Sequence, residues 1–327
     1  MDGDRGVHGR GRLPGQAETR APRRHLRERN RAKGVSSSAL ELLVAGSVGD
    51  GPFGSVAEEL GGSAVYFALA ASLVLPVKVV APVGRDGFKR VSHAFEGRPV
   101  DTTFLQVVDA PTYRWRARQE HGHNVDLGST DSIYDAWEPE APPDFNGWAF
   151  VGSMRPDRQA QVAKMLAPSR LLAADAMLSY VKERPPEAKD VLKRAAWYFC
   201  NQEEFAALGG QDAEQFRRQW WLDGLVLKAG AGGVTAFTAD GSVHVPALTN
   251  HVALDTTGAG DAVAGGMMAR WISTGAERGG LLDALACGVA CASLTIESIG
   301  VRGIATASRG LLEERMAEVM ECVQRGS

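Results

Sequence analysis

The stretch Ala253–Trp271 has the residue types that phosphate chemistry needs. Within it Gly258, Ala259 and Gly260 precede Asp261, and the small, apolar residues that follow predict a helix. N–H groups at a helix N-terminus point outward and carry partial positive charge, so they can bind an anion. Glycines let the backbone come close to that anion because they have no Cβ. A carboxylate at such a place is unfavourable unless it has a task, such as taking a proton from an alcohol that attacks a phosphate.

The same residues also fit a purely structural interpretation. Aspartate is a favoured helix-capping residue, and flexible glycines are common before a helix. Taken alone, the motif therefore leaves phosphate transfer and simple helix capping open. The alternating segment 242–255 predicts a strand that ends at Asp255, which would put the motif at a strand-to-helix junction.

Three other segments have glycine or polar residues next to predicted strands. The segment 227–234, LKAGAGGV, is a glycine-rich turn suited to passing close under a nucleotide. Asn201 and Glu204 stand three residues apart just past a strand, where an amide and a carboxylate can hold hydrated Mg²⁺ beside phosphates. A helix start capped by Asn201 fits those two residues equally well. Gly61 and Gly62 begin a predicted helix, where close packing of helix on sheet is the alternative explanation.

Apolar segments alternate with polar stretches of helical length along most of the chain. Continuous apolar strands separated by helices predict a parallel sheet covered on both faces. The predicted strands are 40–48, 77–84, 148–153, 170–176, 195–201 and 224–230, and a small-residue helix is predicted over 61–74. The segment 103–120 breaks this rhythm, because it alternates like two strands joined at Asp109–Pro111. We expect a hairpin there that forms a flap over the ends of the sheet.

Composition excludes several classes of function. The chain has 327 residues and a net charge of −3. Residues 1–38 carry ten Lys and Arg against four Asp and Glu, a balance of +6, which leaves −9 for the rest. An acidic body argues against nucleic acid as a partner. The basic tail 1–38 has few apolar residues, so a disordered extension explains it better than a nucleic-acid arm or a transit peptide.

Neither the apolar stretches nor the cysteines indicate a membrane or a metal. The longest apolar stretch, 64–80, is interrupted by Pro76 and Lys78, so no membrane span is expected. Cys287 and Cys291 share a helix face, but no second Cys or His pair stands nearby in the sequence. Buried thiols in a reducing cytoplasm are therefore expected. The dinucleotide fingerprint GxGxxG and the P-loop are absent from the glycine-rich turns.

Together, these patterns in this order resemble the ribokinase, or PfkB, family of carbohydrate and nucleoside kinases. The resemblance covers about residues 40–310, and DTTGAGDAVAGGMM at 255–268 matches the family signature at every constrained position. It implies a three-layer α/β/α fold with a central, mainly parallel sheet and a small β lid. The kinase domain would span 39–327, with the lid contributed by about 48–58 and 100–125.

The resemblance also implies a role for each motif residue. Asp261 would be the catalytic base and Gly258, Ala259 and Gly260 the anion hole, with ATP and Mg²⁺ as cofactors and, in many members, K⁺. The other implied residues are Asn201, Glu204, Lys228, Gly230 and Gly233 for nucleotide and Mg²⁺, Asp255 and Thr257 for the monovalent cation, and Asp50, Gly61, Gly62, Tyr66, Arg114 and Arg116 for the acceptor.

Two features depart from the family pattern or are individual to this chain. Ribose-binding members commonly carry Asn five positions after the first glycine of the pair, where this chain has Tyr66, so a plain ribokinase is not expected. Strand periodicity puts Arg114, Arg116 and Arg118 on one face of the predicted lid strand. A charged face in water is the favoured interpretation. The alternative is that one face closes on the acceptor, either with Trp115 stacking on a ring or with the arginines meeting an anionic group.

The predicted function is transfer of the ATP γ-phosphate to an alcohol of a sugar, nucleoside or related small metabolite. A non-catalytic nucleotide-binding regulator on the same fold is one alternative. An NAD-dependent oxidoreductase is a second, which is disfavoured because neither 227–234 nor the glycine motif has the fingerprint spacing. A nucleoside, a hexose, a cyclitol and an antibiotic-like glycoside all stay open as acceptors. Lid strands often pair between subunits in this family, so the resemblance allows a homodimer through the lid.

Overall fold

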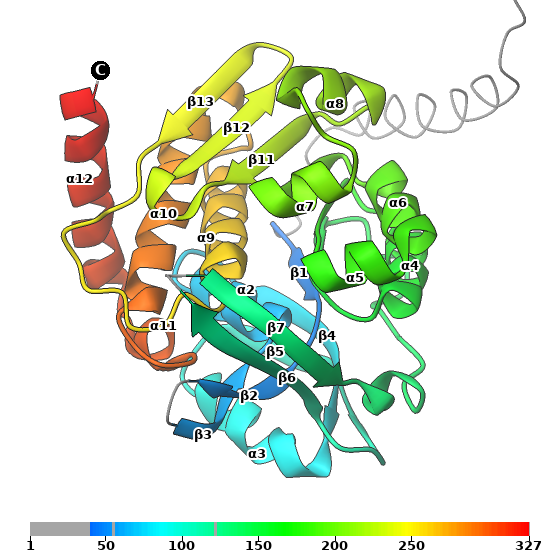
Figure 1. Ribbon diagram of the computed structural model, residues 1–327. Helices are drawn as coiled ribbons and strands as arrows, with labels where there is room; N and C mark the ends of the chain where they lie inside the picture. Colours follow the sequence, from blue (N-terminus) through cyan, green and yellow to red (C-terminus); the bar gives the residue numbers. More distant parts are fainter. Residues whose placement is uncertain (1–39, 54–55, 121–122, 327) are drawn as a thin grey trace, which may run out of the picture. The chain divides into compact units, whose positions relative to one another are not determined.

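A nine-stranded sheet forms the centre of the protein (Figure 1). The computed structural model describes residues 40–53, 56–120 and 123–326. The strand order is β13-β12-β11-β10-β9-β8-β1-β4-β5, and neighbours are parallel except at β11–β12 and β12–β13. The strands are β1 Leu42–Ala45, β4 Val77–Gly84, β5 Val100–Val108, β8 Trp148–Val151, β9 Leu171–Asp175, β10 Trp197–Asn201, β11 Gly224–Lys228, β12 Val234–Thr238 and β13 Gly241–Val245.

Helices cover both faces of this sheet. Residues of β1 alternate between two hydrophobic cores: Leu42 and Val44 enter one, and Leu43 and Ala45 enter the other. The first core includes residues of α2 Ser63–Ala71, α3 Arg85–Ala94, α9 Ala259–Ser273, α10 Leu281–Ile296, α11 Arg302–Thr306 and α12 Arg309–Gly326. The second includes residues of η1 Ser132–Tyr134, α4 Pro156–Met165, α5 Leu178–Glu183, α6 Pro185–Arg194, α7 Gln202–Ala207 and α8 Ala213–Gln219. The predicted α/β/α fold with a mainly parallel sheet is confirmed.

A separate four-stranded sheet has the order β3-β2-β6-β7. Its strands are β2 Gly49–Phe53, β3 Val56–Gly61, β6 Tyr113–Glu120 and β7 His123–Thr130. The hairpin predicted over 103–120 is wrong, because β5 pairs with β4 at the edge of the large sheet, whereas β6 pairs with β2 and β7. The second segment of the small sheet is therefore 113–130, and not 100–125. Alternation identified the strands but did not determine their partners.

The approach to the glycine motif is a loop, and not the strand predicted over 242–255. The strand β13 ends at Val245, before Pro246, which has no N–H for a strand ladder. The loop that follows is held by other contacts: the N–H groups of Leu254 and Asp255 donate to the carbonyl of Ile296, at 2.7 and 3.2 Å. The end of α10 therefore fixes the segment that leads into α9.

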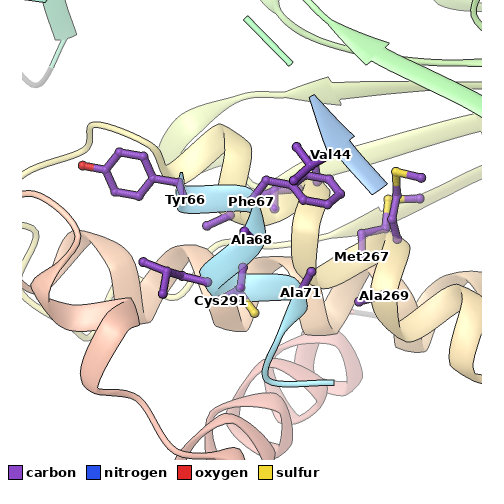
Figure 2. Packing of buried hydrophobic residues seen from close by; sticks show 14 of the residues in the cluster. Val44, Tyr66, Phe67, Ala68, Ala71, Met267, Ala269 and Cys291 are labelled. Atoms are coloured by element: carbon purple, nitrogen blue, oxygen red, sulfur yellow. The ribbon is translucent and has the colours of Figure 1, made fainter. Parts of the chain in front are cut away.

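Small residues let α9 pack very close to two other helices (Figure 2). A Cβ at Gly265 would lie 2.4 Å from the carbonyl oxygen of Phe67 in α2, and one at Gly288 of α10 would lie 2.6 Å from the carbonyl oxygen of Val263 in α9. No side chain fits into such contacts without movement of a backbone. The sequence prediction of a tightly packed, small-residue helix is confirmed, and these contacts fix the position of the α9 N-terminus.

The helix α10 is a helix of the hydrophobic core. The segment Arg278–Ile296 is long and apolar enough to cross a membrane, but 67% of its most apolar window is buried inside the protein. Its Cys287 and Cys291 are free and buried, as is Cys200 of β10, in agreement with the expectation of buried thiols.

We predict that Gly265→Ala lowers the free energy of unfolding by about 1–3 kcal/mol, because the new methyl group overpacks the α2–α9 contact. Urea denaturation measures this. The control is Gly310→Ala, in α12, where the nearest atom to a Cβ is 3.9 Å away; its stability should change by less than about 1 kcal/mol. Equal stability of Gly265→Ala and the wild type would show that the close contact does not constrain α9.

Candidate active site

Three neighbouring strands end in polar residues at the same edge of the large sheet. Asp175, Asn201 and Lys228 are the last residues of β9, β10 and β11, which lie side by side in parallel. The N-terminus of α9 reaches the same edge, because Gly260 lies against the Lys228 ammonium group. Ligands of open α/β sheets bind at the carboxyl ends of parallel strands. The residues predicted from the glycine motif and from the Asn-x-x-Glu segment therefore meet at one site.

The start of α9 has the geometry of an anion site. Gly258 caps the helix with a left-handed backbone (φ 73°) that glycine adopts without strain. Ala259, Gly260 and Asp261 form its first turn. Within the described residues, the N–H groups of Gly258 and Gly260 donate to no acceptor, whereas that of Ala259 bonds the Thr256 carbonyl at 3.3 Å. Unpaired N–H groups at a helix start attract negative charge.

A buried ammonium group lies beside this helix start. A Cβ at Gly260 would be 2.8 Å from the Nζ atom of Lys228, which is itself 4.0 Å from Oδ2 of Asp175. Burial alone would lower the pKa of Lys228, but the charges of Asp175, Glu204 and Asp261 outweigh it and raise the pKa. Lys228 is therefore a permanent positive charge at the anion site.

Asp261 is held in an environment that makes its carboxylate more basic. Burial raises its pKa to about 6, although the charge of Lys228 and a hydrogen bond with Asp175 both act to lower it. Its Oδ1 atom is buried and has no further hydrogen-bond partner among the described residues. A carboxylate with this pKa is ionised at neutral pH and still accepts a proton readily.

Asn201 and Glu204 form a reciprocal helix cap at the start of α7. The Glu204 N–H donates to Oδ1 of Asn201 at 2.9 Å, and the Asn201 N–H donates to Oε2 of Glu204 at 2.8 Å. The capping interpretation of this pair is thus confirmed. Burial raises the pKa of Glu204, and the charge of Lys228 partly offsets the rise. Its remaining oxygen atom, Oε1, has the chemistry to bond a water molecule of a hydrated Mg²⁺ ion.

The glycine-rich turn after β11 is also at this edge. Gly230 begins a short 3-10 helix, Gly230–Gly232, and the N–H of Ala229 donates to the carbonyl of Gly233 at 2.8 Å. Gly233 has φ +86°, and a Cβ there would lie 2.2 Å from the carbonyl oxygen of Val245. The turn therefore requires glycine for its own packing, and its contact with a nucleotide stays a prediction.

Asp255 holds the loop before α9 together. Its Oδ1 accepts the N–H of Thr257 at 2.9 Å, and its Oδ2 accepts the N–H of Gly300 at 3.0 Å. Both oxygens of this buried carboxylate therefore have a structural task. The predicted role of Asp255 and Thr257 in holding a monovalent cation is not needed to explain their positions, and it stays a prediction.

On the predicted acceptor side, Gly62 allows a close approach between α2 and the end of β1. Gly62 has φ +101°, and a Cβ there would lie 2.4 Å from the carbonyl oxygen of Ser47. The N–H of Ser63 donates to Oγ of Ser47 at 3.0 Å, and Oγ of Ser63 donates to the carbonyl of Ser153 at 2.9 Å. Gly61 ends β3 opposite Gly49. The close-packing interpretation of Gly62 is correct, and contact of the glycine pair with an acceptor stays a prediction.

Tyr66 connects the acceptor side with the anion site. It is 1% exposed, and a Cβ at Gly258 would lie 2.2 Å from its ring. Figure 2 shows its side chain pointing away from Phe67 and Val44. Burial raises its pKa, and the charges of Asp255, Asp261 and Glu59 raise it further. Its hydroxyl has no hydrogen-bond partner in the described part of the chain.

Two of the three charged residues predicted for the acceptor, Asp50 and Arg114, have partners within the protein. Asp50 is buried and forms an ion pair with Arg90 of α3 at 2.5 Å. Arg114 forms an ion pair with Asp86 at 3.5 Å, and Arg116 is exposed. These positions agree with the interpretation of a charged strand face in water. Contact of Asp50, Arg114 or Arg116 with an acceptor stays a prediction.

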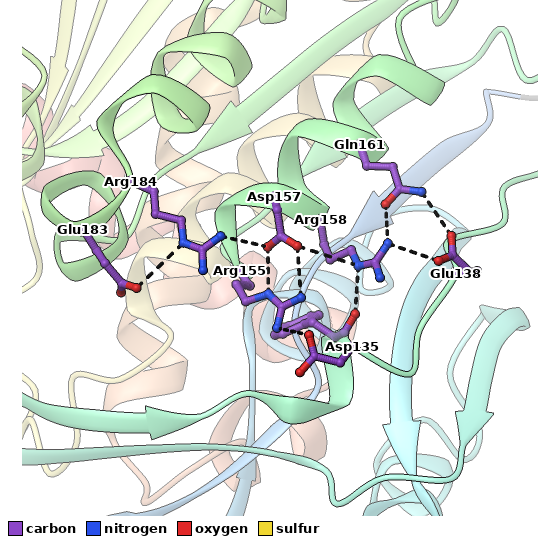
Figure 3. Close-up of polar contacts among 9 residues, drawn as sticks. Asp135, Glu138, Arg155, Asp157, Arg158, Gln161, Glu183 and Arg184 are labelled. Atoms are coloured by element: carbon purple, nitrogen blue, oxygen red, sulfur yellow. Dashed lines mark hydrogen bonds and ion pairs between the residues drawn. The ribbon is translucent and has the colours of Figure 1, made fainter.

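A network of charged residues fixes the segment that follows β8 (Figure 3). Arg155 donates to Asp157 at 2.7 Å and to Asp135 at 2.8 Å, and Arg158 donates to the carbonyl of Tyr134 at 2.8 Å. The charges in this network compensate one another, so we do not count Arg155 and Arg158 among the candidate anion-binding residues.

Sequence reasoning missed Asp175. It ends the apolar strand LLAAD, and no recognised motif marks it. It is 3% exposed, and its carboxyl group lies within hydrogen-bond reach of that of Asp261. The only available signal was an acidic residue at the carboxyl end of a buried strand, where ligands of such sheets bind.

The fold and this site are those expected of a phosphotransferase that acts on small molecules, and comparison with known proteins gives the family. The pfkB family of carbohydrate kinases matches residues 46–307. The chain belongs to this family and is a carbohydrate or nucleoside kinase, a phosphotransferase with an alcohol acceptor. The alternatives of an NAD-dependent oxidoreductase and a non-catalytic regulator are therefore set aside.

Individual relatives differ in the acceptors that their names give. An ATP-dependent ribose-1-phosphate kinase of Halopiger xanaduensis is 28% identical over 258 residues, 76% of this chain and 83% of the relative. The nucleoside kinase of Burkholderia thailandensis in complex with inosine has a TM-score of 0.71 at 17% identity, covering 86% of this chain and 99% of that one. Aminoimidazole riboside kinase from Salmonella enterica, in complex with aminoimidazole riboside and an ATP analogue, has a TM-score of 0.67 at 21% identity, covering 84% and 99%.

We predict that Gly258→Ala damages both stability and activity, because the new methyl group meets the Tyr66 ring and the left-handed backbone is strained. The strain alone costs about 1–2 kcal/mol, and Gly275→Ala is its control, since Gly275 has φ +89° and its nearest contact is at 3.9 Å. Unfolding free energies and turnover should fall further in Gly258→Ala than in Gly275→Ala.

A double-mutant cycle with Tyr66→Ala checks the cause. Removal of the ring should recover part of the stability that Gly258→Ala loses. Additive losses in the double variant would mean that the ring is not what excludes a side chain at position 258.

Proposed function

We propose that this protein transfers the γ-phosphate of ATP to an alcohol group of a sugar, nucleoside or related small metabolite, with Asp261 as the general base. The observation that carries the proposal is the meeting, at the strand ends, of Asp261, the Lys228 ammonium and two N–H groups that have no acceptor among the described residues. A base and an anion site in contact are what phosphoryl transfer to an alcohol needs.

Asp261 would accept the proton of the attacking hydroxyl. A carboxylate of pKa about 6 is ionised at neutral pH, so it is ready before the acceptor binds. Its place in the first turn of α9 puts it next to Gly260, whose N–H faces the same site. The hydroxyl oxygen becomes a better nucleophile as its proton leaves, while the phosphoryl group is within reach of the amides.

Negative charge on the transferred phosphoryl group would be stabilised by Gly258, Gly260 and Lys228. N–H groups fixed at a helix start need no reorganisation when charge develops, which is the main advantage of such donors. The raised pKa of Lys228 keeps its ammonium charged at all working pH values. Ala259 lies between the two glycines, and its N–H already donates to the Thr256 carbonyl. It is therefore not counted among the donors to the phosphoryl group.

Nucleotide and ions would occupy the side of the site near β10 and β11. We assign Gly230 and Gly233 to the turn under the nucleotide. Glu204 would bind hydrated Mg²⁺ through water, with Asn201 fixing its carboxylate. Bound Mg²⁺ would neutralise phosphate charge. K⁺ would have to share Asp255 with the two N–H groups that the carboxylate already accepts.

The acceptor would lie between Asp261 and the small sheet, near Tyr66. A buried hydroxyl without a partner costs free energy, so a ligand group that bonds it is favoured. The ring also fills space that Asn would leave open, which supports an acceptor pocket different from that of a plain ribokinase. A screen of ADP release over nucleosides, free sugars, cyclitols and ribose 1-phosphate tests the proposal and identifies the acceptor. No acceptor-dependent ADP release with any class would contradict it.

We predict that Asp261→Asn lowers turnover at least about a hundredfold, the low end for a lost general base. Nucleotide affinity, measured by calorimetry, should stay nearly unchanged because the amides and Lys228 remain. Asp283→Asn, on α10 in an ion pair with Arg270, is the control and should keep normal turnover. Near-normal turnover in Asp261→Asn would exclude it as the base.

We predict that Tyr66→Phe raises the KM for the acceptor about five- to tenfold with little change in kcat, because one hydrogen bond to the bound acceptor is lost. The free energy of unfolding should be equal or higher, since a buried unpaired hydroxyl is removed. Tyr134→Phe is a matched control, because that hydroxyl is also buried without a partner among the described residues but belongs to the other core. An unchanged KM in Tyr66→Phe would remove Tyr66 from the acceptor site.

A further inference from the structure

Asp175 is a buried carboxyl group that the proposed mechanism does not use. It is the last residue of β9 and is 3% exposed. A side chain of α4 holds its main chain: Nε2 of Gln159 donates to the Asp175 carbonyl at 3.0 Å and to the Gly152 carbonyl at 3.1 Å. The main chain at the end of β9 is therefore held in place at the edge of the site.

This carboxyl group lies between Lys228 and Asp261. Its Oδ2 is 4.0 Å from Nζ of Lys228, and its carboxyl group lies within hydrogen-bond reach of that of Asp261. Oδ1 of Asp175 and Oδ1 of Asp261 are both buried, and neither has another hydrogen-bond partner among the described residues. Two carboxyl groups can form a hydrogen bond only if one of them holds a proton.

The surrounding charges favour one proton on this pair. Around it lie Lys228 from β11, Glu204 from α7, Tyr66 from α2, and Tyr198 and Cys200 from β10. Lys228 is the one cation among these residues, so a fully ionised pair would leave an excess of negative charge where polyphosphate must bind. Like charges this close cannot both ionise near neutral pH.

We propose that Asp175 is a positioning residue for the base: it keeps the single shared proton and donates it in a hydrogen bond that orients the ionised Asp261. This inference rests on the proposed function, in which Asp261 takes the proton of the acceptor. Asp175 does not touch the reacting atoms in this scheme, and no proton is gained or lost by it during turnover.

The titration of the pair agrees with this division of roles. Burial and then the charge of Asp261 raise the pKa of Asp175 well above its ordinary value, whereas the pKa of Asp261 is raised only to about 6. Above about pH 6 the pair therefore holds one proton, and Asp261 is the ionised partner. Below it both are protonated, and the base is lost, so the rate should fall as the pH falls through this value.

The test compares Asp175→Asn, whose amide still donates a hydrogen bond, with Asp175→Val, which is of similar size and donates none. The acid limb of the kcat/KM profile, which reports the pKa of the free enzyme, should stay near pH 6 in Asp175→Asn. In Asp175→Val it should move upward by about one pH unit, because Asp261 loses the donor that favours its charged form. Identical acid limbs in the two variants would overturn the proposal.

A second measurement needs neither activity nor the valine variant. Infrared spectra of protein with isotope-labelled aspartate, free of nucleotide, should contain the C=O stretch of a protonated aspartate well above pH 6. That band should be absent from Asp175→Asn. Its absence from the wild type, or its persistence in Asp175→Asn, would overturn the proposal. If Asp261→Asn kept its activity while this band behaved as expected, the proposed function would fail and the shared proton would stand.

Discussion

A single ammonium group, that of Lys228, lies among three carboxyl groups at the edge of the sheet, and the rest of the site depends on this arrangement. Burial is the largest cause of the raised pKa values of Asp175, Glu204 and Asp261. For Asp261, burial outweighs the charge of Lys228 and the contact with Asp175, so that its pKa is about 6 beside the start of α9. The basicity of Asp261 therefore depends on its burial, and Lys228 supplies the positive charge beside it.

The order of the strands in the sheet brings these charged and polar groups together. Asp175, Asn201 and Lys228 end three adjacent parallel strands, and the register pairs Asn201 with Lys228 directly. Strands about 4.8 Å apart bring side chains at their ends within reach of one another. The fourth component, Asp261, is set by helix packing, because Gly265 lets α9 sit directly on the Phe67 carbonyl of α2. Backbone contacts thus fix both halves of the site.

The sequence predicted the parts of the fold that depend on local pattern. The strand 77–84 and the helix that begins at the glycine motif have the predicted positions. Both could be predicted because the pattern of neighbouring residues is enough to identify a buried strand or a small-residue helix. Partner choice is not local: the alternation of 103–120 was correct for two strands, but β5 and β6 belong to different sheets. Asp175 was missed for the same reason. It becomes a site residue only through its proximity to Asp261, which is far away in the sequence.

The contact between Tyr66 and Gly258 ties the acceptor side to the anion site. The tyrosine ring occupies the space that a Cβ at position 258 would need, so the large residue of α2 and the missing side chain before α9 are complementary. A smaller residue at position 66 would open a gap directly against the helix cap, and a larger one at 258 would displace the ring. Under the proposed function, a substitution at position 66 that adapts the pocket to another acceptor would also have to preserve the left-handed turn at Gly258, which would place the phosphate-binding amides. Acceptor choice and phosphate binding would then be constrained by the same pair of residues.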